Sequence, residues 1–369
     1  MELDRKREHL EIALSRESQG PCSTWLEYVH PVHIALPELS IDDVDTRVKF
    51  LGYELRAPLI IEGMTGGSPQ LEKVNAKLAE LAQSMGIAIG VGSQRPMLKD
   101  PNLVRSYRVV REIARDVPVI ANIGGVQLAK MRREEIENLV SSIEADALAV
   151  HLNPAQELVQ PEGDRDFRGI VDGIRRALEV LSVPIIVKEV GTGLSMEVAR
   201  TLYEIGVRIF DVAGAGGTNW IKIEWIRASR RGDDPLFVEV ARNFMGWGIP
   251  TAVSVVEVRS AAPDAVIIAS GGIRSGIDVL KSIALGADLA GIAWPALVAV
   301  MTGSRELDKI VYELRMAMLL TGSRTIEDVK RCSIVVYGRL AEWICARKLK
   351  LRNTRAYVSC MGWSQSWSS

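Results

Sequence analysis

Short apolar segments rich in Ile, Val and Ala recur along the chain, and a longer stretch with helical spacing of apolar positions follows each of them. The segments do not alternate apolar with polar residues, a pattern typical of parallel strands that helices cover on both faces. Amphipathic helices are predicted between them, for example over Leu71–Met85 and Met196–Ile205. Eight segments fit this description: Pro58–Ile61, Ile87–Val91, Pro118–Ala121, Ala147–Leu152, Pro184–Val187, Val207–Val212, Ala265–Ala269 and Leu289–Ala293.

Eight strand-and-helix units between Pro58 and Val298 match the size of a closed (β/α)8 barrel, with a doubly wound open sheet as the alternative. We therefore predict an α/β fold, a TIM barrel over residues 56–300, with an N-terminal arm and crossover over 1–55. A C-terminal helical extension is expected over 301–350, and the polar segment 351–369 is expected to be disordered. The longer gap from Asn219 to Pro263 predicts an insertion after the sixth strand.

The charge of the 369-residue chain is almost balanced, with 45 Lys and Arg against 46 Asp and Glu. This balance argues against a nucleic-acid partner, and no apolar run is long enough to cross a membrane. The four cysteines form no Cys-x-x-Cys pair, which argues against structural zinc and against the disulfide framework of a secreted protein. The charged first twenty residues resemble no signal peptide, so we expect a reducing, cytoplasmic compartment.

Polar residues and glycines follow all eight predicted strands. In a barrel of this kind, the active site lies at the carboxyl ends of the strands. The clearest signal is Gly271-Gly272 with Arg274 after the seventh strand. Glycines let backbone N–H groups approach an anion, and the N-terminus of the next helix favours negative charge. A phosphate site is therefore predicted at this loop.

Lys188 ends the fifth predicted strand, where burial of an amine is costly unless it has a task. It could contact a flavin ring near N1 or form a Schiff base. A structural ion pair with Glu189 or Asp211 is the alternative.

Four polar residues cluster after the fourth strand: His151, Asn153, Gln156 and Glu157. His and Asn can hydrogen-bond a diphosphate, and Glu157 offers the hard oxygen that Mg²⁺ requires. One carboxylate is enough where substrate phosphates and water complete the octahedron. Glu62 and other carboxylates at strand ends leave the metal assignment open on chemistry alone.

Basic residues also stand near the N-terminus, in a charged helix predicted over Glu2–Ser15 that carries Arg5, Lys6 and His9. Such a run is typical of a solvated helix face. The alternative is an arm that closes over an anionic substrate.

Eight motifs occur in a fixed order between Arg5 and Arg274, within a resemblance that covers roughly residues 5 to 345. They are Arg5-Lys6-x-x-His9, Met64-Thr65-Gly66-Gly67, Ser93-Gln94-Arg95, Asn122, His151-Leu-Asn153-x-x-Gln156-Glu157, Val187-Lys188-Glu189-Val190-Gly191, Gly216-Gly217-Thr218-x-Trp220 and Ser270-Gly271-Gly272-Ile273-Arg274. Each is weak alone, but the ordered set closely resembles type 2 isopentenyl diphosphate isomerase, a family of flavin-dependent barrel enzymes. The composition, rich in Ala, Val and Arg, suggests an archaeal source.

The resemblance implies FMN that is active in its reduced form, Mg²⁺, and NADPH or NADH as the reductant. The reaction it implies converts isopentenyl diphosphate into dimethylallyl diphosphate by a 1,3-allylic proton shift, in a homo-tetramer or homo-octamer. One position departs from the family pattern: Ala213 stands where some members have Ser at a flavin contact.

The resemblance also assigns roles to residues of this chain. FMN would be held by Met64, Thr65, Gly66, Ser93, Asn122, Lys188, Thr218, Gly271, Gly272, Arg274, Ala293 and Trp294. The substrate would contact Arg5, Lys6, His9, Ser93, Gln94, Arg95, His151, Asn153 and Gln156, and Glu157 would hold the metal. The catalytic set would be Gln156, Glu157, Lys188, Trp220 and Glu224.

Two other functions are weighed against this one. An FMN-dependent oxidoreductase of the 2-hydroxyacid oxidase or inosinate dehydrogenase type shares the Gly-Gly loop and the strand-five lysine. The first needs a late histidine base, and no His follows His151; the second needs a cysteine in the strand-six loop, which has none. A non-catalytic phosphate-binding barrel would not need the cluster from His151 to Glu157.

Overall fold

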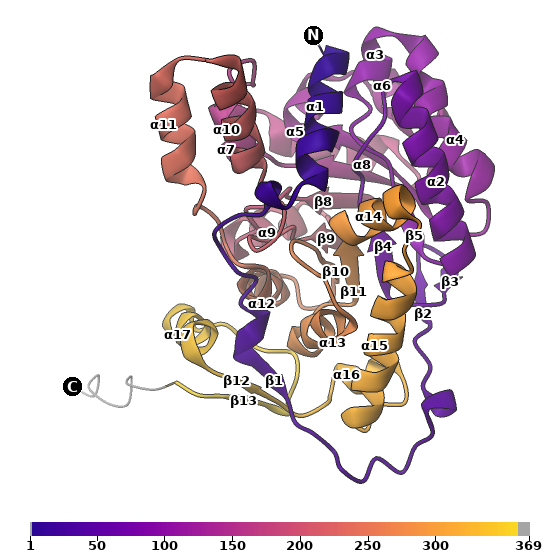
Figure 1. The fold of residues 1–369 in the computed structure, drawn as a ribbon, viewed down its shortest axis with the longest axis vertical. Helices are drawn as coiled ribbons and strands as arrows, with labels where there is room; N and C mark the ends of the chain where they lie inside the picture. The colour runs from indigo at the N-terminus through magenta and orange to yellow at the C-terminus, as the bar shows by residue number, and fades with distance from the viewer. Residues whose placement is uncertain (1, 361–369) are drawn as a thin grey trace.

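Eight parallel strands close into a barrel in this computed structural model, which describes residues 2–360 without the side chains of residues 2–5, 7 and 16 (Figure 1). The strands are β4 (Leu59–Ile61), β5 (Ala88–Gly90), β6 (Val119–Gly124), β7 (Ala147–His151), β8 (Ile185–Lys188), β9 (Ile209–Asp211), β10 (Val266–Ala269) and β11 (Leu289–Ile292). β11 pairs with β4 through Ala290 and Leu59 and so closes the ring. Each strand overlaps one predicted segment, and the predicted (β/α)8 barrel is confirmed.

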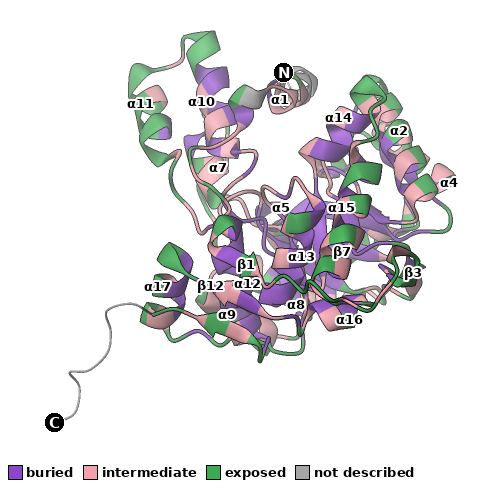
Figure 2. Ribbon diagram, turned by 60° about the horizontal axis from the view of Figure 1, so that its bottom comes forward, coloured by how far each residue is buried: buried purple, intermediate pink, exposed green. Residues whose placement is uncertain are grey.

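Helices surround the barrel and bury one face of each against the strands (Figure 2). They are α2 (Pro69–Met85), α3 (Arg95–Lys99), α4 (Arg105–Ile113), α5 (Gly125–Lys130), α6 (Arg133–Ser141), α7 (Pro154–Val159), α8 (Ile170–Val180), α9 (Met196–Glu204), α12 (Thr251–Ala261), α13 (Gly276–Leu285) and α14 (Trp294–Thr302). The ends of α2 show the local cause: the Ser68 hydroxyl accepts from Leu71 N, and Gly86 ends the helix at φ +64°.

Side chains fill the inside of the barrel, so it is a packed core and not a pore. The inward-facing set includes Ile60, Ala88, Ile120, Ala149, Ile186, Ile209, Ile268 and Leu289. A hairpin of β2 (Val48–Phe50) and β3 (Tyr53–Leu55) adds Phe50 and Leu55 to this cluster. Ligands can therefore enter only from the other end, where the strands terminate.

The N-terminal helix α1 (Glu2–Leu14) and the predicted insertion after β9 lie over that open end (Figure 1). The insertion forms α10 (Trp220–Arg231) and α11 (Pro235–Phe244). Ile12 of α1 packs on Ile223 and Ile226 of α10, and Glu8 receives a bond of 3.1 Å from Arg227. The arm is thereby fixed beside the mouth of the barrel.

A second, three-stranded sheet joins distant parts of the chain: β1 (Val29–Pro31), β12 (Ile334–Val336) and β13 (Ala356–Val358). The helical extension predicted over residues 301–350 is therefore interrupted in its second half. This half divides into α16 (Ile326–Val329), β12 and α17 (Gly338–Arg347), because the β-branched run Ile334–Val336 pairs with β1. α15 (Glu306–Leu320) forms as predicted and packs on α13 and α14.

The segment after residue 350 differs from the predicted disorder up to Cys360. β13 pairs with β12, and the buried Asn353 side chain donates to Cys332 O at 2.8 Å. Cys345 and Cys360 form a disulfide with Cα atoms 6.3 Å apart, against the expectation of a chain without disulfides. Neither feature has a signal in the hydrophobic pattern; the remainder of the predicted tail, 361–369, lies outside the described residues.

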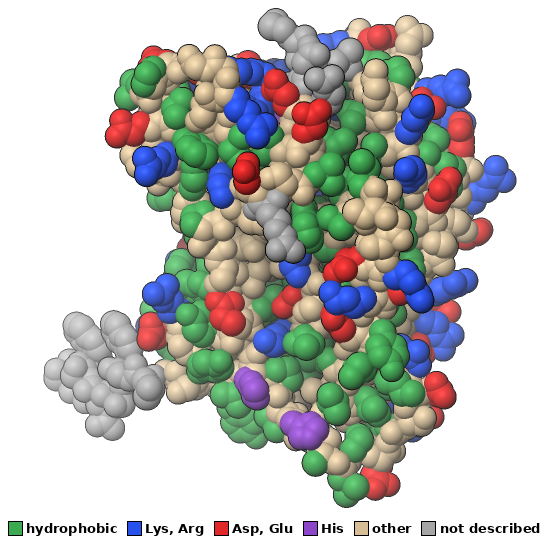
Figure 3. Space-filling view, in the orientation of Figure 1, with side chains coloured by type: hydrophobic (Ala, Val, Ile, Leu, Met, Phe, Trp, Pro, Cys, Tyr) green, Lys and Arg blue, Asp and Glu red, His purple; other side chains and the backbone are tan. Residues whose placement is uncertain are grey.

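Short 3-10 turns complete the described chain at Arg16–Ser18, Leu26–Tyr28, Ile41–Asp43 and Pro101–Val104. Acidic and basic side chains are interspersed on the face shown in Figure 3, as the balanced charge predicts. Within residues 2–360, no helix has the length and apolar character that crossing a membrane requires.

The disulfide gives the first testable prediction. Replacing Cys360 by Ser should release β13, because the cross-link no longer limits the freedom of the loop between residues 345 and 360. Hydrogen exchange at the amides of Ala356–Val358 should become faster and the melting temperature should fall. Cys22→Ser, which removes a cysteine outside the disulfide, should leave both unchanged. Unchanged exchange at β13 in the Cys360→Ser variant would contradict the prediction.

Candidate active site

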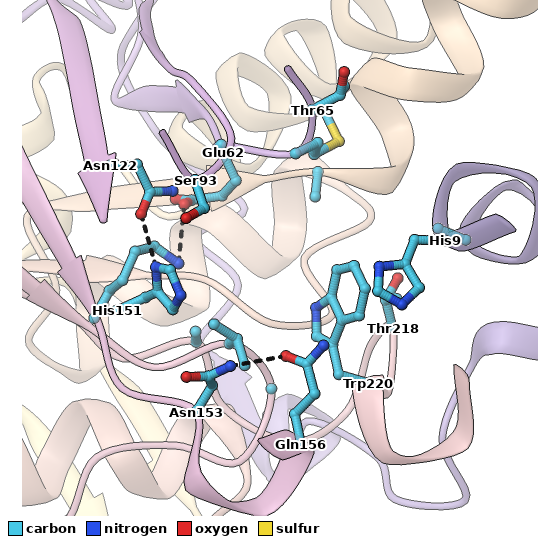
Figure 4. A pocket seen from close by; sticks show the side chains of 18 of the residues that line it. His9, Glu62, Thr65, Ser93, Asn122, His151, Asn153, Gln156, Thr218 and Trp220 are labelled. Carbon is cyan, nitrogen blue, oxygen red and sulfur yellow. Dashed lines mark hydrogen bonds and ion pairs between the residues drawn. The ribbon is translucent and has the colours of Figure 1, made fainter. Parts of the chain in front are cut away.

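A pocket opens at the carboxyl ends of all eight barrel strands, under α1 and α10 (Figure 4). Nineteen of the residues that the sequence assigns to the site line it, although they are spread over almost 290 positions of the chain. They are Lys6, His9, Met64, Thr65, Ser93, Arg95, Asn122, His151, Asn153, Gln156, Glu157, Lys188, Thr218, Trp220, Gly271, Gly272, Arg274, Ala293 and Trp294. The closed barrel is what brings them together.

One side of the mouth is built largely from backbone. Gly271 and Gly272 have φ values of +94° and +83°, which L side chains rarely adopt. A Cβ atom on Gly271 would stand 2.1 Å from Gly214 O, and one on Gly272 would stand 2.4 Å from Gly216 O. The loops after β9 and β10 therefore pack main chain against main chain, and the glycines are required for this contact.

A partly buried guanidinium lies at this side of the pocket. Arg274 donates to Gln19 Oε1 at 2.9 Å and to Ile273 O at 3.0 Å, both neutral oxygens, and its Cζ lies 5.3 Å from the centre of the Trp294 ring. Burial lowers the pKa of Arg274 to about 10, although Asp278 opposes the shift. A cation held in this way, beside a glycine loop, suits a phosphate group.

The hydroxyl of Thr65 offers a second indication that the pocket holds a polar ligand. Its Oγ1 atom is buried and has no hydrogen-bond partner among the described residues. Buried hydroxyls in folded proteins are rarely left unpaired. A ligand with a polar edge, lying between Thr65 and the Gly271 loop, would satisfy it; the residues present thus fit FMN.

The floor of the pocket carries one amine and two carboxylates. Lys188 Nζ lies 3.1 Å from Asp211 Oδ2 and 3.4 Å from Glu62 Oε2, and it donates to Glu189 O at 2.9 Å. Burial would lower the pKa of Lys188, but Asp211 and Glu62 raise it above the ordinary value, so the amine stays charged. The alternative pairing of Lys188 with the Glu189 carboxylate does not form.

The Glu189 carboxylate turns instead to the backbone of its own loop. It accepts from the N–H groups of Val190, Gly191 and Thr192 at 2.6, 2.8 and 2.6 Å. This capping fixes the loop after β8 and so fixes the strand end that carries Lys188.

His151 faces the pocket in a fixed orientation (Figure 4). Its Nδ1 lies 2.9 Å from Asn122 Oδ1, and the Asn122 amide nitrogen donates to Val91 O at 3.0 Å. Burial, together with the charges of Lys188 and Arg95, lowers the pKa of His151 to about 3. The imidazole is therefore neutral in the ligand-free pocket, and its Nδ1–H is directed to Asn122.

A chain of hydrogen bonds runs from α7 to the N-terminal arm. Asn153 donates to Gln156 Oε1 at 3.2 Å, Gln156 donates to Glu224 Oε1 at 3.4 Å, and His9 Nε2 lies 2.8 Å from the same oxygen. Trp220 stands edge-on to His9, with ring centres 5.2 Å apart. The hydrogen bonds along this wall of the pocket therefore lead from both ends to the Glu224 carboxylate.

Glu224 lies behind this wall and does not line the pocket. Burial would raise its pKa, but His9 and the bonded Arg227 together lower it, so the carboxylate is ionised. An ionised group at this place can orient Gln156 and stabilise a charged His9.

Glu157 points toward the same wall from the first turn of α7. Its Oε1 accepts from Asn153 at 3.2 Å and its Oε2 from Asp164 N at 2.7 Å. Among residues 2–360 no group of three His, Cys, Asp or Glu side chains is placed to hold a metal ion. A metal at Glu157 would therefore need most of its ligands from a bound substrate and water.

Besides Glu224, two predicted residues do not line the pocket, and the side chain of one more is not described. Gln94 differs from the prediction of a substrate contact: its side chain is fully buried and bonds Leu139 O and Asn122 N, because it ties β5 to β6. Gly66 does not line the pocket; its carbonyl accepts from Lys6 Nζ at 2.5 Å. The side chain of Arg5 lies outside the described residues.

The pocket also contains residues outside the predicted site set. Glu62 and Ser270 belong to the floor, and Gln127, Gln160 and Leu10 to the walls. The position of Glu62 directly after a buried strand was a usable signal, whereas Gln127 lies within α5 and Gln160 at the end of α7, and neither had one.

Comparison with known proteins identifies the class and then the family. Residues 132–336 match the family model of FMN-dependent dehydrogenases. Solved structures with the same fold include one from Pediococcus acidilactici described as a lactate oxidase (TM-score 0.64, 16% identity, 91% of this chain and 94% of that chain). A mandelate oxidase variant matches with a TM-score of 0.59 at 16% identity, over 89% of this chain and 92% of that one. The fold and the pocket are thus those of an FMN-dependent barrel.

Curated relatives define the family more narrowly. An isopentenyl-diphosphate delta-isomerase of Aeropyrum pernix is 48% identical over 354 residues, which is 94% of each chain. The protein of the same name from Metallosphaera sedula is 46% identical, over 95% of this chain and 96% of its own, and that from Methanothrix thermoacetophila is 48% identical, over 92% and 94%. This chain belongs to the isopentenyl-diphosphate delta-isomerase family, as its motifs predict.

The backbone-built side of the pocket gives the second testable prediction. Gly271→Ala should lower the free energy of unfolding by about 1–3 kcal/mol more than Gly303→Ala, because only the first places a Cβ against backbone. Gly303 is a matched control, since it also has a positive φ (+71°) but has nothing within 4 Å of a Cβ. Urea unfolding of both variants measures the difference, and equal losses would refute the packing argument.

Proposed function

We propose that this chain isomerises isopentenyl diphosphate to dimethylallyl diphosphate by a 1,3-allylic proton shift, for isoprenoid biosynthesis. One observation carries the proposal. The pocket has two sites suited to phosphate on opposite sides of its mouth: the Gly271 loop with Arg274, and the wall from Lys6 to Glu157. A phosphorylated cofactor and a diphosphate substrate would each occupy one.

FMN would lie between Thr65 and the Gly271 loop, with its phosphate at Arg274 and its ring toward Lys188. The reduced cofactor supplies an electron-rich ring that stabilises positive charge and exchanges a proton at the reacting carbon atoms. Lys188, kept charged by Asp211 and Glu62, would favour the anionic form of that ring. NADPH or NADH would provide the electrons.

The substrate diphosphate would be anchored by the basic side of the mouth. Lys6, Arg95, His151 and Asn153 line this side, and Arg5 belongs to the same helix as Lys6. Anchoring the charged end aligns an apolar five-carbon tail that offers few contacts of its own. A diphosphate beside His151 would favour the protonated imidazole, which the ligand-free pocket disfavours.

Proton transfer opposite the flavin would involve the hydrogen-bonded chain on the wall. Gln156 is a poor acid or base by itself, but it contacts the ionised Glu224 and the Asn153 amide. Gln156 would relay a proton to the ionised Glu224 or to Glu157, or would only orient these carboxylates. Trp220 would stabilise cationic character at the tail by about 0.5–2 kcal/mol.

Glu157 would bind Mg²⁺ together with substrate phosphate oxygens and water. Its position next to Asn153 supports this role, since both would meet the same diphosphate. We further propose a homo-tetramer or homo-octamer in the cytoplasm. The exposed apolar face of α11, which includes Leu236, Phe237 and Phe244, is consistent with contacts between copies.

The assay that tests the function uses the purified, FMN-loaded protein with isopentenyl diphosphate and Mg²⁺. Dimethylallyl diphosphate should form only after the flavin is reduced by NADPH, NADH or dithionite without oxygen, because oxidised FMN is electron-poor. A colourless protein, or equal turnover with oxidised flavin in air, would contradict the proposal. Oxidation of lactate or mandelate would favour the oxidoreductase alternative.

The metal site is tested by Glu157→Gln. The amide keeps the shape but removes the charge, so the Mg²⁺ concentration for half-maximal activity should rise at least about 10-fold. Glu179→Gln on the exposed surface of α8 should leave the titration unchanged. An unaltered Mg²⁺ requirement in the Glu157 variant would show that the metal binds elsewhere.

A further inference from the structure

We propose that Glu62 is a positioning residue that takes up a proton when negative charge is placed beside Lys188. Through this uptake, Lys188 would remain available to the anionic edge of reduced FMN. The inference rests on the proposed FMN site, but it does not require that the protein be an isomerase.

The geometry that supports it is one amine shared by two carboxylates. Lys188 Nζ lies 3.1 Å from Asp211 and 3.4 Å from Glu62, and the three side chains are 11%, 2% and 13% exposed. The Asp211 carboxylate is held further by the Ser270 hydroxyl at 2.5 Å and by Ala213 N at 3.3 Å. Asp211 is therefore the more firmly held partner, whereas Glu62 lies at the pocket surface with fewer bonds.

The pocket is shaped to place a carboxyl group here. A Cβ atom on Gly291 would stand 2.1 Å from Glu62 Oε1, so a side chain at that position would displace Glu62. The backbone of Glu62 is fixed as well, since its N–H donates to Ile292 O at 2.9 Å. Strands β4 and β11 together hold the carboxyl group over Lys188.

The charges of the cluster explain why a proton is needed. With all three groups ionised, Lys188 (+1), Glu62 (−1) and Asp211 (−1) sum to −1. An anionic ring edge next to Lys188 would bring the total to −2 in a buried place, where uncompensated charge is costly. One proton on Glu62 restores −1. Burial and the nearby Asp211, opposed by Lys188, already raise the pKa of Glu62 to about 8 without any ligand.

Other ionisable groups near the floor do not serve the same purpose. His151 has its pKa lowered to about 3 and stays neutral. Burial raises the pKa of Glu189 as well, but its carboxylate accepts from three backbone N–H groups that oppose the shift, and it does not contact Lys188 Nζ. Arg95 lies 3.7 Å from Asp164, on the substrate side. Of the described groups at the floor, Glu62 is thus the carboxylate that faces Lys188 without backbone N–H groups to hold its charge.

The balance of the step is simple. Reduction of FMN to its anionic form takes two electrons, from a dihydronicotinamide or from an electrode, and one proton on the ring. The second proton comes from solvent and goes to Glu62. Near and above the pKa of Glu62 in the oxidised protein, reduction would therefore take up more than one proton, approaching two.

Spectroelectrochemistry of the FMN-loaded protein counts these protons, because the slope of midpoint potential against pH gives the protons taken up per two electrons. Between about pH 8.5 and 9.5, reduction of the wild type should take up close to two protons per two electrons, and reduction of the Glu62→Gln variant should take up one. Glu62→Asp, which keeps the carboxyl group, should restore most of the second. The flavin spectrum of the oxidised wild type should also shift with pH near 8, and the Gln variant should lack that shift.

Equal slopes in the wild type and Glu62→Gln would overturn the inference, as would a wild-type slope of one proton over this range. A wild-type slope of one proton would overturn the inference even if the Gln variant fails to retain FMN. Failure of the isomerase assay would leave these slopes unaffected, so the two proposals fail separately. A protein that binds no FMN would overturn both.

Discussion

Closure of the sheet between β11 and β4 is the constraint on which the site depends. Hydrogen bonds between Ala290 and Leu59 and their neighbours turn eight separate strands into a ring, and every strand then ends at the same face. Residues as distant in sequence as Lys6 and Trp294 reach one pocket only because of this ring. The hairpin of β2 and β3 packs against the core at the opposite end of the barrel.

Electrostatics divides that pocket into regions with different tasks. At the floor, Lys188 is charged because two carboxylates outweigh its burial; at one side Arg274 is charged but weakened by burial; and on the substrate wall His151 is neutral. Each state follows from the immediate surroundings and not from the residue type. A flavin and a diphosphate are both anionic, and under the proposed function this division would separate the places where each is held.

Much of this arrangement could be predicted from the sequence because barrels translate sequence order into position. A short apolar run predicts each buried strand, and the few residues that follow the run must lie at the carboxyl end of the barrel, where the pocket opens. Two kinds of feature could not be predicted. Gln94 belongs to a motif of pocket residues, but its side chain points into the core and bonds Leu139 O and Asn122 N. The residue order in a loop after a strand does not determine which of its side chains faces the pocket. The pairing of Cys345 with Cys360 and the strand β13 depend on contacts across the chain, which no local pattern encodes.

The main-chain contact between the loops at Gly214 and Gly271 has a consequence for how this scaffold can change over evolution. A surface made from peptide groups offers no side chains to replace, so mutation can abolish it but can hardly reshape it. The opposite half, formed by α1, α7 and α10, consists of side chains on helices that tolerate substitution individually. New chemistry on such a barrel would therefore arise by variation of those three helices, while the glycine-lined half is inherited unaltered.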